Sequence, residues 1–119
     1  MGNKTGGQGV WMAYTTWPDQ AQASAFAHDV VGRALVACAS VSGPVVSHYF
    51  WQGKLEQSEE WLVTLKLCDA QRDALKLHVA TSHPYEVPEL LLFEVGDGLS
   101  SYLQWVRDSA GQEPDRDLT

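Results

Sequence analysis

The sequence feature that most constrains the fold is a strand-like run of unusual length, from Lys54 to Leu67. A second strand-like run, Val45 to Trp51, precedes it, and the Gln52-Gly53 pair between them is typical of a tight hairpin turn. The longer run would extend about 45 Å at roughly 3.3 Å per residue, whereas a small domain is only about 30 Å across. Part of this hairpin is therefore predicted to project beyond the globule that carries it.

The hairpin also carries aromatic and charged side chains that predict contact with other subunits. Its aromatic residues include Tyr49, Phe50, Trp51 and Trp61. A projecting ribbon with exposed edges and aromatic surface is prone to association unless another subunit covers it. Alternation places Glu56, Glu60 and Lys66 on the face away from the helices, where a buried charge needs a partner from another strand or subunit. We therefore expect a closed ring of subunits that exchange hairpins.

The remaining segments predict the other strands and the helices. Strands are expected at Val10–Thr16, Cys38–Ser42 and Glu89–Val95, with a bend at Gly43-Pro44. Helices are expected at Asp19–Val36, at Ala70–Thr81 and after Ser101. The inward face of the second helix is predicted to consist of Ala74, Leu75, His78 and Val79. Asp69 is expected to cap the second helix, and Ser101 with Gln104 to form a capping box for the last. The order β-α-β-β-α-β-α predicts an α+β, ferredoxin-like βαββαβ two-layer sandwich with a C-terminal helix.

Length and composition indicate one soluble domain. We expect a flexible arm at residues 1–9, the domain at 10–108 and a polar tail at 109–119. The 8 Lys and Arg against 15 Asp and Glu give a net charge of −7, which disfavours nucleic acid as a partner. No apolar run approaches the roughly 18 residues that cross a membrane. Because Cys38 and Cys68 lie in apolar segments and no signal segment is evident, we expect reduced thiols and a cytoplasmic location.

The segment from His83 to Glu89, read His-Pro-Tyr-Glu-Val-Pro-Glu, is the candidate functional segment. Each proline fixes its own φ and pushes the residue before it toward extended geometry. The preceding helix should therefore end near Ser82. His83, Tyr85 and Glu86 would then lie on a stiff connector.

These side chains have both a chemical and a structural interpretation. His83 is a candidate copper or zinc ligand, because neutral imidazole suits both ions, but a histidine at a helix C-terminus also bonds free carbonyl groups. Tyr85, Glu86 and Glu89 would either line a cleft between subunits, or pack and remain solvated. No phosphate-binding glycine loop or G-x-S-x-G motif occurs, so we expect no enzyme. A hydrolase that uses His83 with Glu86 is the remaining enzymatic alternative.

Five aromatic residues form the last candidate set. They are Tyr49, Trp51, Trp61, Tyr102 and Trp105. They could form a ligand cage, but aromatic residues dominate the energetics of subunit contacts, so we expect them at a trimer interface.

Several segments together resemble one known family. They are Leu35-Val36-Ala37-Cys38, Ser47-x-Tyr49-x-Trp51-x-Gly53-Lys54, Glu60-Trp61 with Lys66, the His83–Glu89 segment, and Tyr102-Leu103-x-Trp105. In this order and spacing they resemble the CutA proteins, which are associated with divalent-cation tolerance. The resemblance covers about residues 10 to 108.

The resemblance implies an assembly and a ligand. It implies a ferredoxin-like protomer in a tight homotrimer, with an architecture similar to the PII-type signalling proteins. It also implies binding of copper or another divalent cation near His83, at clefts between subunits, and no established enzymatic reaction. The cleft candidates are Tyr85, Glu86, Glu60 and Lys66.

The chain departs from the family at its proposed copper site. That site comprises a cysteine on the first strand and two adjacent histidines, and the spacing back from the prolines places Thr15, Ser82 and His83 there. Leu67 also replaces a threonine that the family usually has. The alternative function is therefore a PII-like signalling module that binds a small anionic ligand or a protein partner, with metal incidental.

Overall fold

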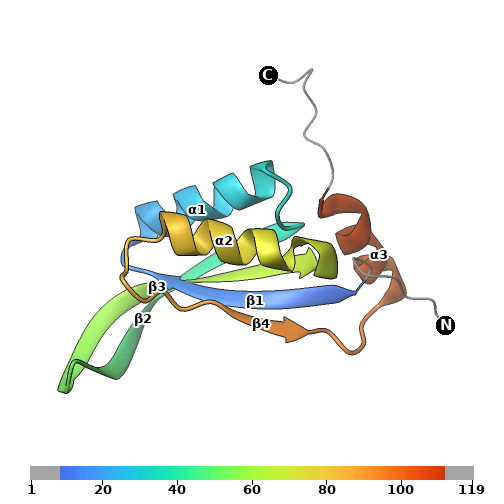
Figure 1. The fold of residues 1–119 in the computed structure, drawn as a ribbon. Helices are drawn as coiled ribbons and strands as arrows, with labels where there is room; N and C mark the ends of the chain where they lie inside the picture. The colour runs from blue at the N-terminus through green and yellow to red at the C-terminus, as the bar shows by residue number, and fades with distance from the viewer. Residues whose placement is uncertain (1–8, 112–119) are drawn as a thin grey trace.

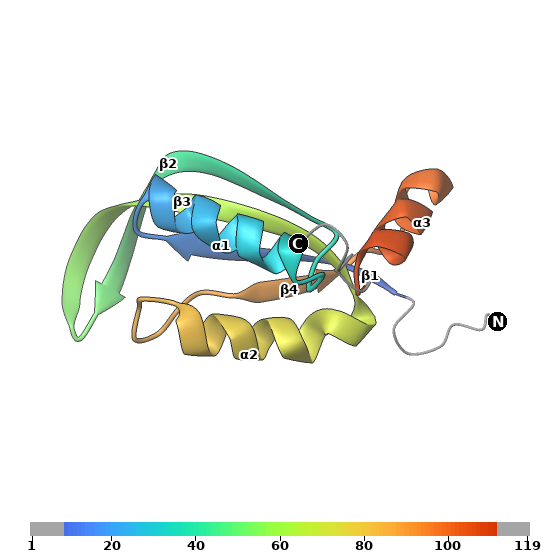
Figure 2. The same cartoon turned by 90° about the horizontal axis from the view of Figure 1, so that it is seen from above.

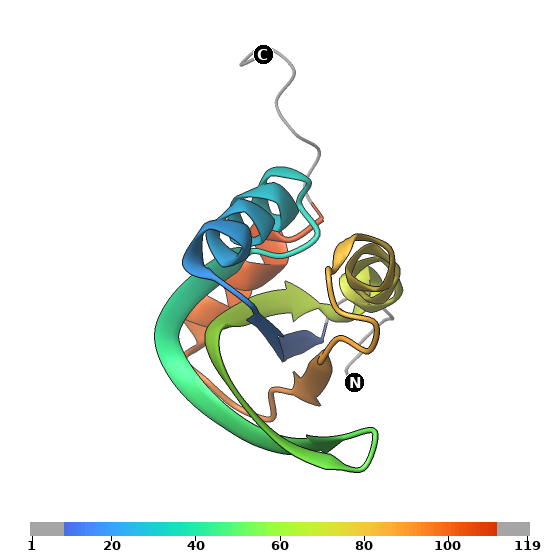
Figure 3. The same cartoon turned by 90° about the vertical axis from the view of Figure 1, so that its left-hand side faces the viewer.

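The computed structural model of the protein describes residues 9–111. Its elements are β1 (Val10–Trp17), α1 (Gln20–Gly32), β2 (Cys38–Trp51), β3 (Lys54–Cys68), a 3-10 turn (Asp69–Gln71), α2 (Arg72–Ser82), β4 (Leu91–Glu94) and α3 (Ser100–Ser109). The strands pair antiparallel in the order β2-β3-β1-β4. Both α1 and α2 lie on one side of this sheet (Figure 1 and Figure 3). The predicted ferredoxin-like sandwich is confirmed, whereas the predicted arm, apart from residue 9, and the tail beyond residue 111 lie outside the described residues.

The long hairpin has the predicted form. β2 and β3 pair from Cys38 opposite Lys66 to Trp51 opposite Lys54, whereas β1 reaches along β3 only as far as Trp61. The first half of β3 therefore pairs with β2 alone within the described chain, and Figure 2 shows it extending past both helices. The longest dimension of the described chain is 48 Å.

Two local features shape the hairpin. Gln52 and Gly53 have φ values of 52° and 80°, the left-handed geometry that a two-residue hairpin turn of this kind requires. The β2–β3 register shifts between Ser42 and Val45, which confirms the predicted bend at Gly43.

The core lies between the sheet and the two helices. Val63, Leu65 and Leu67 are fully buried, as their alternation along β3 predicts. Phe26 and Val30 from α1, and Leu75 and Val79 from α2, belong to the same cluster. Each fully buried aliphatic side chain contributes about 1.5–3 kcal/mol, so this layer holds both helices on the sheet.

The predicted end of the first helix is wrong. α1 ends at Gly32, short of Val36, because Ala34 adopts a left-handed φ of 59°. The Ala34 N–H donates to the Val31 carbonyl at 2.9 Å, and the Leu35 N–H donates to the Val30 carbonyl at 3.0 Å. This pair of bonds is a Schellman motif, which ends a helix even where the apolar pattern continues.

Three further predictions about helix starts and faces are wrong. Asp69 begins the 3-10 turn instead of capping α2, and its carboxylate accepts a 2.8 Å hydrogen bond from Arg72. α3 begins at Ser100 without a side-chain cap, so the Ser101–Gln104 capping box does not form. Ala74 is exposed, because the buried stripe of α2 consists of Leu75 and Val79.

The start of the fourth strand also differs from prediction. β4 begins at Leu91 instead of Glu89. Near the C-terminal end of the described residues, Ala110 is buried and the Gly111 N–H donates to the Ala34 carbonyl at 2.7 Å. None of the helices within residues 9–111 is long and apolar enough to cross a membrane.

Candidate functional site

The connector after α2 begins where the prolines predict. α2 ends at Ser82, and His83 follows in extended geometry with φ −76° and ψ 141°. The His83 N–H donates to the Val79 carbonyl at 3.0 Å, which closes the last helical turn. Pro84 then prevents the helix from continuing.

The imidazole of His83 is enclosed by two aromatic rings. It is only 9% exposed and lies between the rings of Trp17 and Tyr85, at centroid distances of 4.0 and 4.8 Å. Nε2 is 2.8 Å from the Thr16 carbonyl oxygen, and Nδ1 accepts a hydrogen bond of 3.1 Å from the Tyr85 N–H. Because a carbonyl oxygen only accepts, Nε2 donates, and one neutral tautomer satisfies both contacts.

The surroundings of His83 favour the neutral ring. Desolvation lowers its pKa, and this effect outweighs the Thr16 carbonyl and the negative charge of Glu60, which act in the opposite direction. The remaining lone pair on Nδ1 is used by Tyr85, so a metal ion would have to displace that N–H. Within residues 9–111, no three His, Cys, Asp or Glu side chains are grouped to hold a metal. Metal ligation by His83 stays a prediction.

The other two positions of the family's copper site have different roles here. Thr15 is fully buried opposite Val63 on the helical side of the sheet, and its hydroxyl has no hydrogen-bond partner among residues 9–111. The Ser82 hydroxyl is exposed and donates to the His78 carbonyl at 2.6 Å. Neither residue supplies the thiolate or imidazole that copper sites commonly use.

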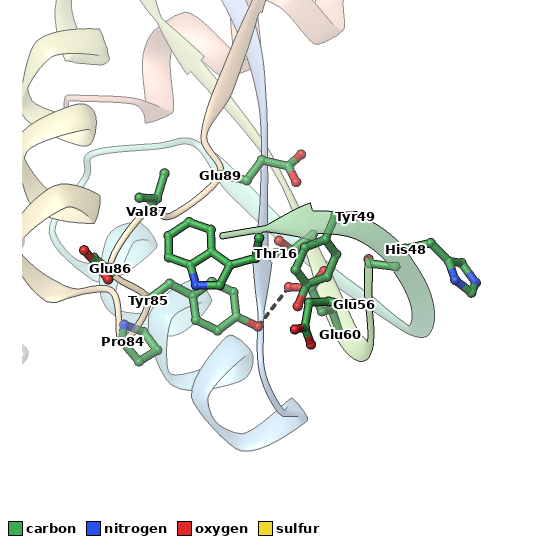
Figure 4. A pocket seen from close by; sticks show the side chains of 12 residues that line it. Thr16, His48, Tyr49, Glu56, Glu60, Pro84, Tyr85, Glu86, Val87 and Glu89 are labelled. Atoms are coloured by element: carbon green, nitrogen blue, oxygen red, sulfur yellow. Dashed lines mark hydrogen bonds between the residues drawn. The ribbon is translucent and has the colours of Figure 1, made fainter. Parts of the chain in front are cut away.

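Two of the predicted cleft residues meet beside His83. The Tyr85 hydroxyl, from the connector, donates a 2.8 Å hydrogen bond to a carboxylate oxygen of Glu60 on β3, as Figure 4 shows. Glu60 is only 7% exposed. Burial raises the pKa of Tyr85, and the hydrogen bond to Glu60 and its negative charge raise it further. The phenol therefore stays protonated and serves as a donor to the carboxylate.

This pair lies in a cavity of about 860 Å³ between the hairpin and the connector. The cavity is lined by Thr16, Ser47, His48, Tyr49, Trp51, Glu56, Glu60, Pro84, Tyr85, Glu86, Val87 and Glu89. Four of these residues are glutamates and none is lysine or arginine. In Figure 4 the Tyr49 and Glu56 side chains lie near Glu60, whereas His48 and Glu86 are at opposite margins.

The structure separates some residues that the sequence grouped. Lys66 does not line the cavity, because it lies six positions along β3 from Glu60 and pairs there with Met12 and Cys38. Trp61 packs against Gly43 at the bend of β2. Sequence reasoning missed Thr16, although the same alternation that places Glu56 beside the cavity was available for β1.

The aromatic set divides into two surfaces. Tyr49 and Trp51 lie on the hairpin, while Tyr102 and Trp105 stack on α3 with centroids 5.7 Å apart. α3 lies at the opposite end of the sheet from the hairpin tip (Figure 1). The Tyr102 hydroxyl is also 3.8 Å from the sulfur of Cys38. A single aromatic cage from all five residues is therefore not formed within one subunit.

Comparison with known proteins gives a consistent result. Residues 11–109 match the family model described as CutA1 divalent ion tolerance protein. Proteins named divalent-cation tolerance protein CutA from Yersinia pestis and Yersinia pseudotuberculosis are each 39% identical to the chain over 94 residues, 79% of both sequences.

Solved structures of similar proteins support the same match. CutA1 from Oryza sativa has a TM-score of 0.85 at 28% identity, over 92% of this chain and all of that one. The divalent cation tolerance protein from Thermus thermophilus has a TM-score of 0.83 at 30% identity, over 86% of this chain and 99% of that one. Both comparisons span nearly the whole described structure.

Proposed function

Because this chain belongs to the CutA family of divalent ion tolerance proteins, we propose that it acts in the response to divalent cations by binding a ligand at the cavity beside Tyr85 and Glu60. In this proposal it is a cytoplasmic homotrimer without enzymatic activity, and neighbouring subunits complete the cavity. The observation that carries the proposal is the buried Glu60 carboxylate, which the Tyr85 hydroxyl holds inside a strongly acidic cavity. The two free thiols, Cys38 and Cys68, support the proposed cytoplasmic location, because the cytoplasm keeps thiols reduced.

Exposed apolar residues on the hairpin support the homotrimer. Phe50, Leu55 and Val46 are 76%, 71% and 57% exposed in the single subunit. A two-stranded ribbon is marginally stable alone, so a neighbour that covers this surface would stabilise it. β4 also has an edge that pairs with no strand of the described chain. A ribbon that meets a different surface on its neighbour generates a ring when the rotation closes.

The metal part of the proposal concerns copper or another divalent cation, with His83 as the imidazole ligand. Copper binding would require His83 Nδ1 to release the Tyr85 N–H, so binding would be coupled to movement of the connector. Calorimetric titration with Cu²⁺ in a non-chelating buffer tests this directly. We expect His83→Ala to lose at least about tenfold in affinity, or about 1.4 kcal/mol.

A matched control is His28→Ala, because His28 is exposed on α1 and does not line the cavity. That variant should bind Cu²⁺ as the wild type does. If His83→Ala also binds like the wild type, or if no protein binds better than millimolar, His83 is not a metal ligand.

The second candidate is a PII-like signalling module in which metal is incidental. Two observations favour it: both ring nitrogens of His83 have protein partners, and no three-ligand group occurs within residues 9–111. The lining of the cavity, with four glutamates and no basic residue, disfavours the anionic ligand considered for this alternative.

A thermal-shift screen tests whether the cavity binds the small anionic ligand of the PII-like alternative. A specific ligand at 100 times its Kd adds about 2.7 kcal/mol of stability. We expect nucleotides and small anions to give no shift. A clear stabilisation by any of them would show that the protein binds an anionic ligand and that charge repulsion in this cavity does not prevent binding.

A further inference from the structure

We propose that the Asp97-Gly98 pair is a site of spontaneous covalent modification, where Asp97 cyclises to a succinimide that reopens to isoaspartate. This is the only Asp-Gly pair in the 119-residue sequence. The inference goes beyond the proposed function, because it concerns neither the cavity nor its ligand. It can therefore fail or succeed independently of metal binding and of trimer formation.

The first argument is the place of the pair in the fold. Residues 95–99 join β4 to α3 without regular secondary structure, and residues 96–99 are exposed. Figure 1 shows this loop at the end of the sheet opposite the hairpin tip. Glycines on both sides of Asp97 leave the backbone freer than any other residues would. No helix or strand geometry therefore holds the Asp97 carboxyl group away from the next nitrogen.

The second argument is the contact between the two reacting groups. The Gly98 N–H donates to Oδ1 of Asp97 at 2.9 Å. The nitrogen therefore already lies beside the carboxyl carbon, Cγ, to which it would bond. Groups that are held close together react faster, because little freedom of movement remains to be lost when they approach.

The chemical step uses only these two residues and water. The Gly98 nitrogen attacks Cγ of the Asp97 carboxyl group in its protonated form, so a C–N bond forms. The C–O bond to the hydroxyl breaks, and the hydroxyl leaves as water with the proton of the nitrogen. Water then opens the ring at either carbonyl. Opening at the main-chain carbonyl leaves isoaspartate, whereas opening at Cγ restores aspartate. The net reaction requires no oxidant, cofactor or group from a neighbouring subunit.

Isoaspartate at this position would alter the attachment of α3. The main chain would then pass through Cβ and Cγ of residue 97, which lengthens the link between β4 and α3 by one carbon atom. A Cβ on Gly98 would lie 3.3 Å from Cδ2 of Leu103, so the loop is packed directly against α3. Leu103 in turn packs against the core cluster that includes Val106 and Cys68. We expect amide protons of α3 to exchange faster in the modified form, and unchanged exchange there would contradict this consequence.

Incubation of the whole protein in mildly acidic buffer tests the proposal. Isoaspartate is located by mass spectrometry of peptides and counted by labelling with a protein isoaspartate methyltransferase. We expect isoaspartate to accumulate at residue 97. The folded protein should convert at a rate within about tenfold of the chain unfolded in urea, because the loop already holds the reacting groups together.

Two variants test the roles of the two residues. Asp97→Glu keeps the charge at the exposed position but enlarges the ring that must close, so we expect no conversion there. Gly98→Ala places a methyl group beside the attacking nitrogen and should slow conversion by at least about tenfold. The added Cβ meets only the end of the flexible Leu103 side chain within 3.4 Å, so the fold should be retained.

Asp73 serves as an internal control in every sample. Its side chain is 95% exposed, but it lies within α2 and is followed by Ala74. Helical geometry fixes its backbone dihedrals, so it should remain aspartate. The proposal is overturned if no isoaspartate forms at residue 97 in the folded protein, if folding slows conversion by more than about tenfold, or if Asp73 converts as fast as Asp97.

Discussion

His83 shows how one residue type can indicate metal binding from the sequence and a structural role from its contacts. Its ring links β1, α2 and the connector, because Nε2 donates to Thr16 and Nδ1 accepts from Tyr85. The sequence predicted the helix end and the extended backbone at this position. It could not reveal the contact with Thr16, because Thr16 is far away along the chain and meets His83 only after the sheet has formed.

The lowered pKa of His83 predicts a pH dependence of stability. In the unfolded chain its pKa lies near the ordinary 6.5, and desolvation lowers it in the folded protein. As pH falls below about 6.5, the unfolded state binds more protons than the folded state, so the free energy of unfolding decreases by at most about 1.4 kcal/mol per pH unit. The loss ends once pH falls below the pKa of the folded state.

Urea denaturation of His83→Gln between pH 7 and pH 5 measures this contribution. The Gln side chain can still donate to Thr16 but does not titrate, so its stability should depend less on pH than that of the wild type. His28→Gln, an exposed change on α1, should keep the wild-type dependence. If the free energy of unfolding depends equally on pH in the wild type and in His83→Gln, the buried ring does not contribute to the pH dependence of stability.

Glu60 was predicted in part. Alternation along β3 placed it on the face away from the helices and indicated that it needs a partner from elsewhere. Its actual partner is Tyr85, and the predicted cleft residue Lys66 is absent from the cavity lining. Periodicity gives the face of a strand but not the path of the connector that crosses it.

At the level of elements, the bend and the turn of the hairpin depend on two glycines with different requirements. Gly53 has a φ of +80°, and nothing lies within 4 Å of the position that a Cβ would take there. Gly43 has a φ of +147°, and a Cβ there would lie 3.0 Å from Trp61 Cε3 and 3.1 Å from the Glu60 carbonyl oxygen. The backbone therefore requires glycine at both positions, but only Gly43 also needs the empty space.

Three alanine substitutions separate these requirements. Gly96→Ala should change the free energy of unfolding by less than about 0.5 kcal/mol, because nothing lies within 4 Å of the added Cβ. Gly53→Ala should cost about 1 kcal/mol for the left-handed backbone. Gly43→Ala should cost about 2 kcal/mol or more, since strain and overlap add. Chemical denaturation gives all three values, and a Gly43→Ala variant as stable as Gly96→Ala would contradict the account.

The type and order of all the main elements could be predicted because apolar periodicity and the prolines were clear. Most of the errors lie at the ends of elements, and one concerns Ala74 on the predicted inward face of α2. Ala34 adopts a left-handed φ that alanine rarely takes, so no composition signal marked the end of α1. The start of α3 has no side-chain cap at all, although Ser101 and Gln104 have the spacing of one.

At the level of the whole molecule, the projecting hairpin gives a direct test of assembly. Phe50 is 76% exposed in one subunit and lies near the hairpin tip. Phe50→Glu should convert a trimer to monomers, because a charge would be buried at the contact. Leu77→Glu is the matched control, since Leu77 is 65% exposed on α2. Size-exclusion chromatography with light scattering distinguishes the species, and a wild-type protein that is monomeric at micromolar concentration would exclude the trimer.

β3 has two unlike halves: residues 61–68 are held on both sides by β1 and β2, whereas residues 54–60 have β2 alone within the described chain. In the proposed homotrimer, the first half would be covered by neighbouring copies of the chain, whereas the second half is paired on both sides within its own subunit. If this homotrimer forms, dilution should speed the exchange of amide protons with solvent in residues 54–60, while residues 61–68 keep slow exchange, and the change should begin at Trp61.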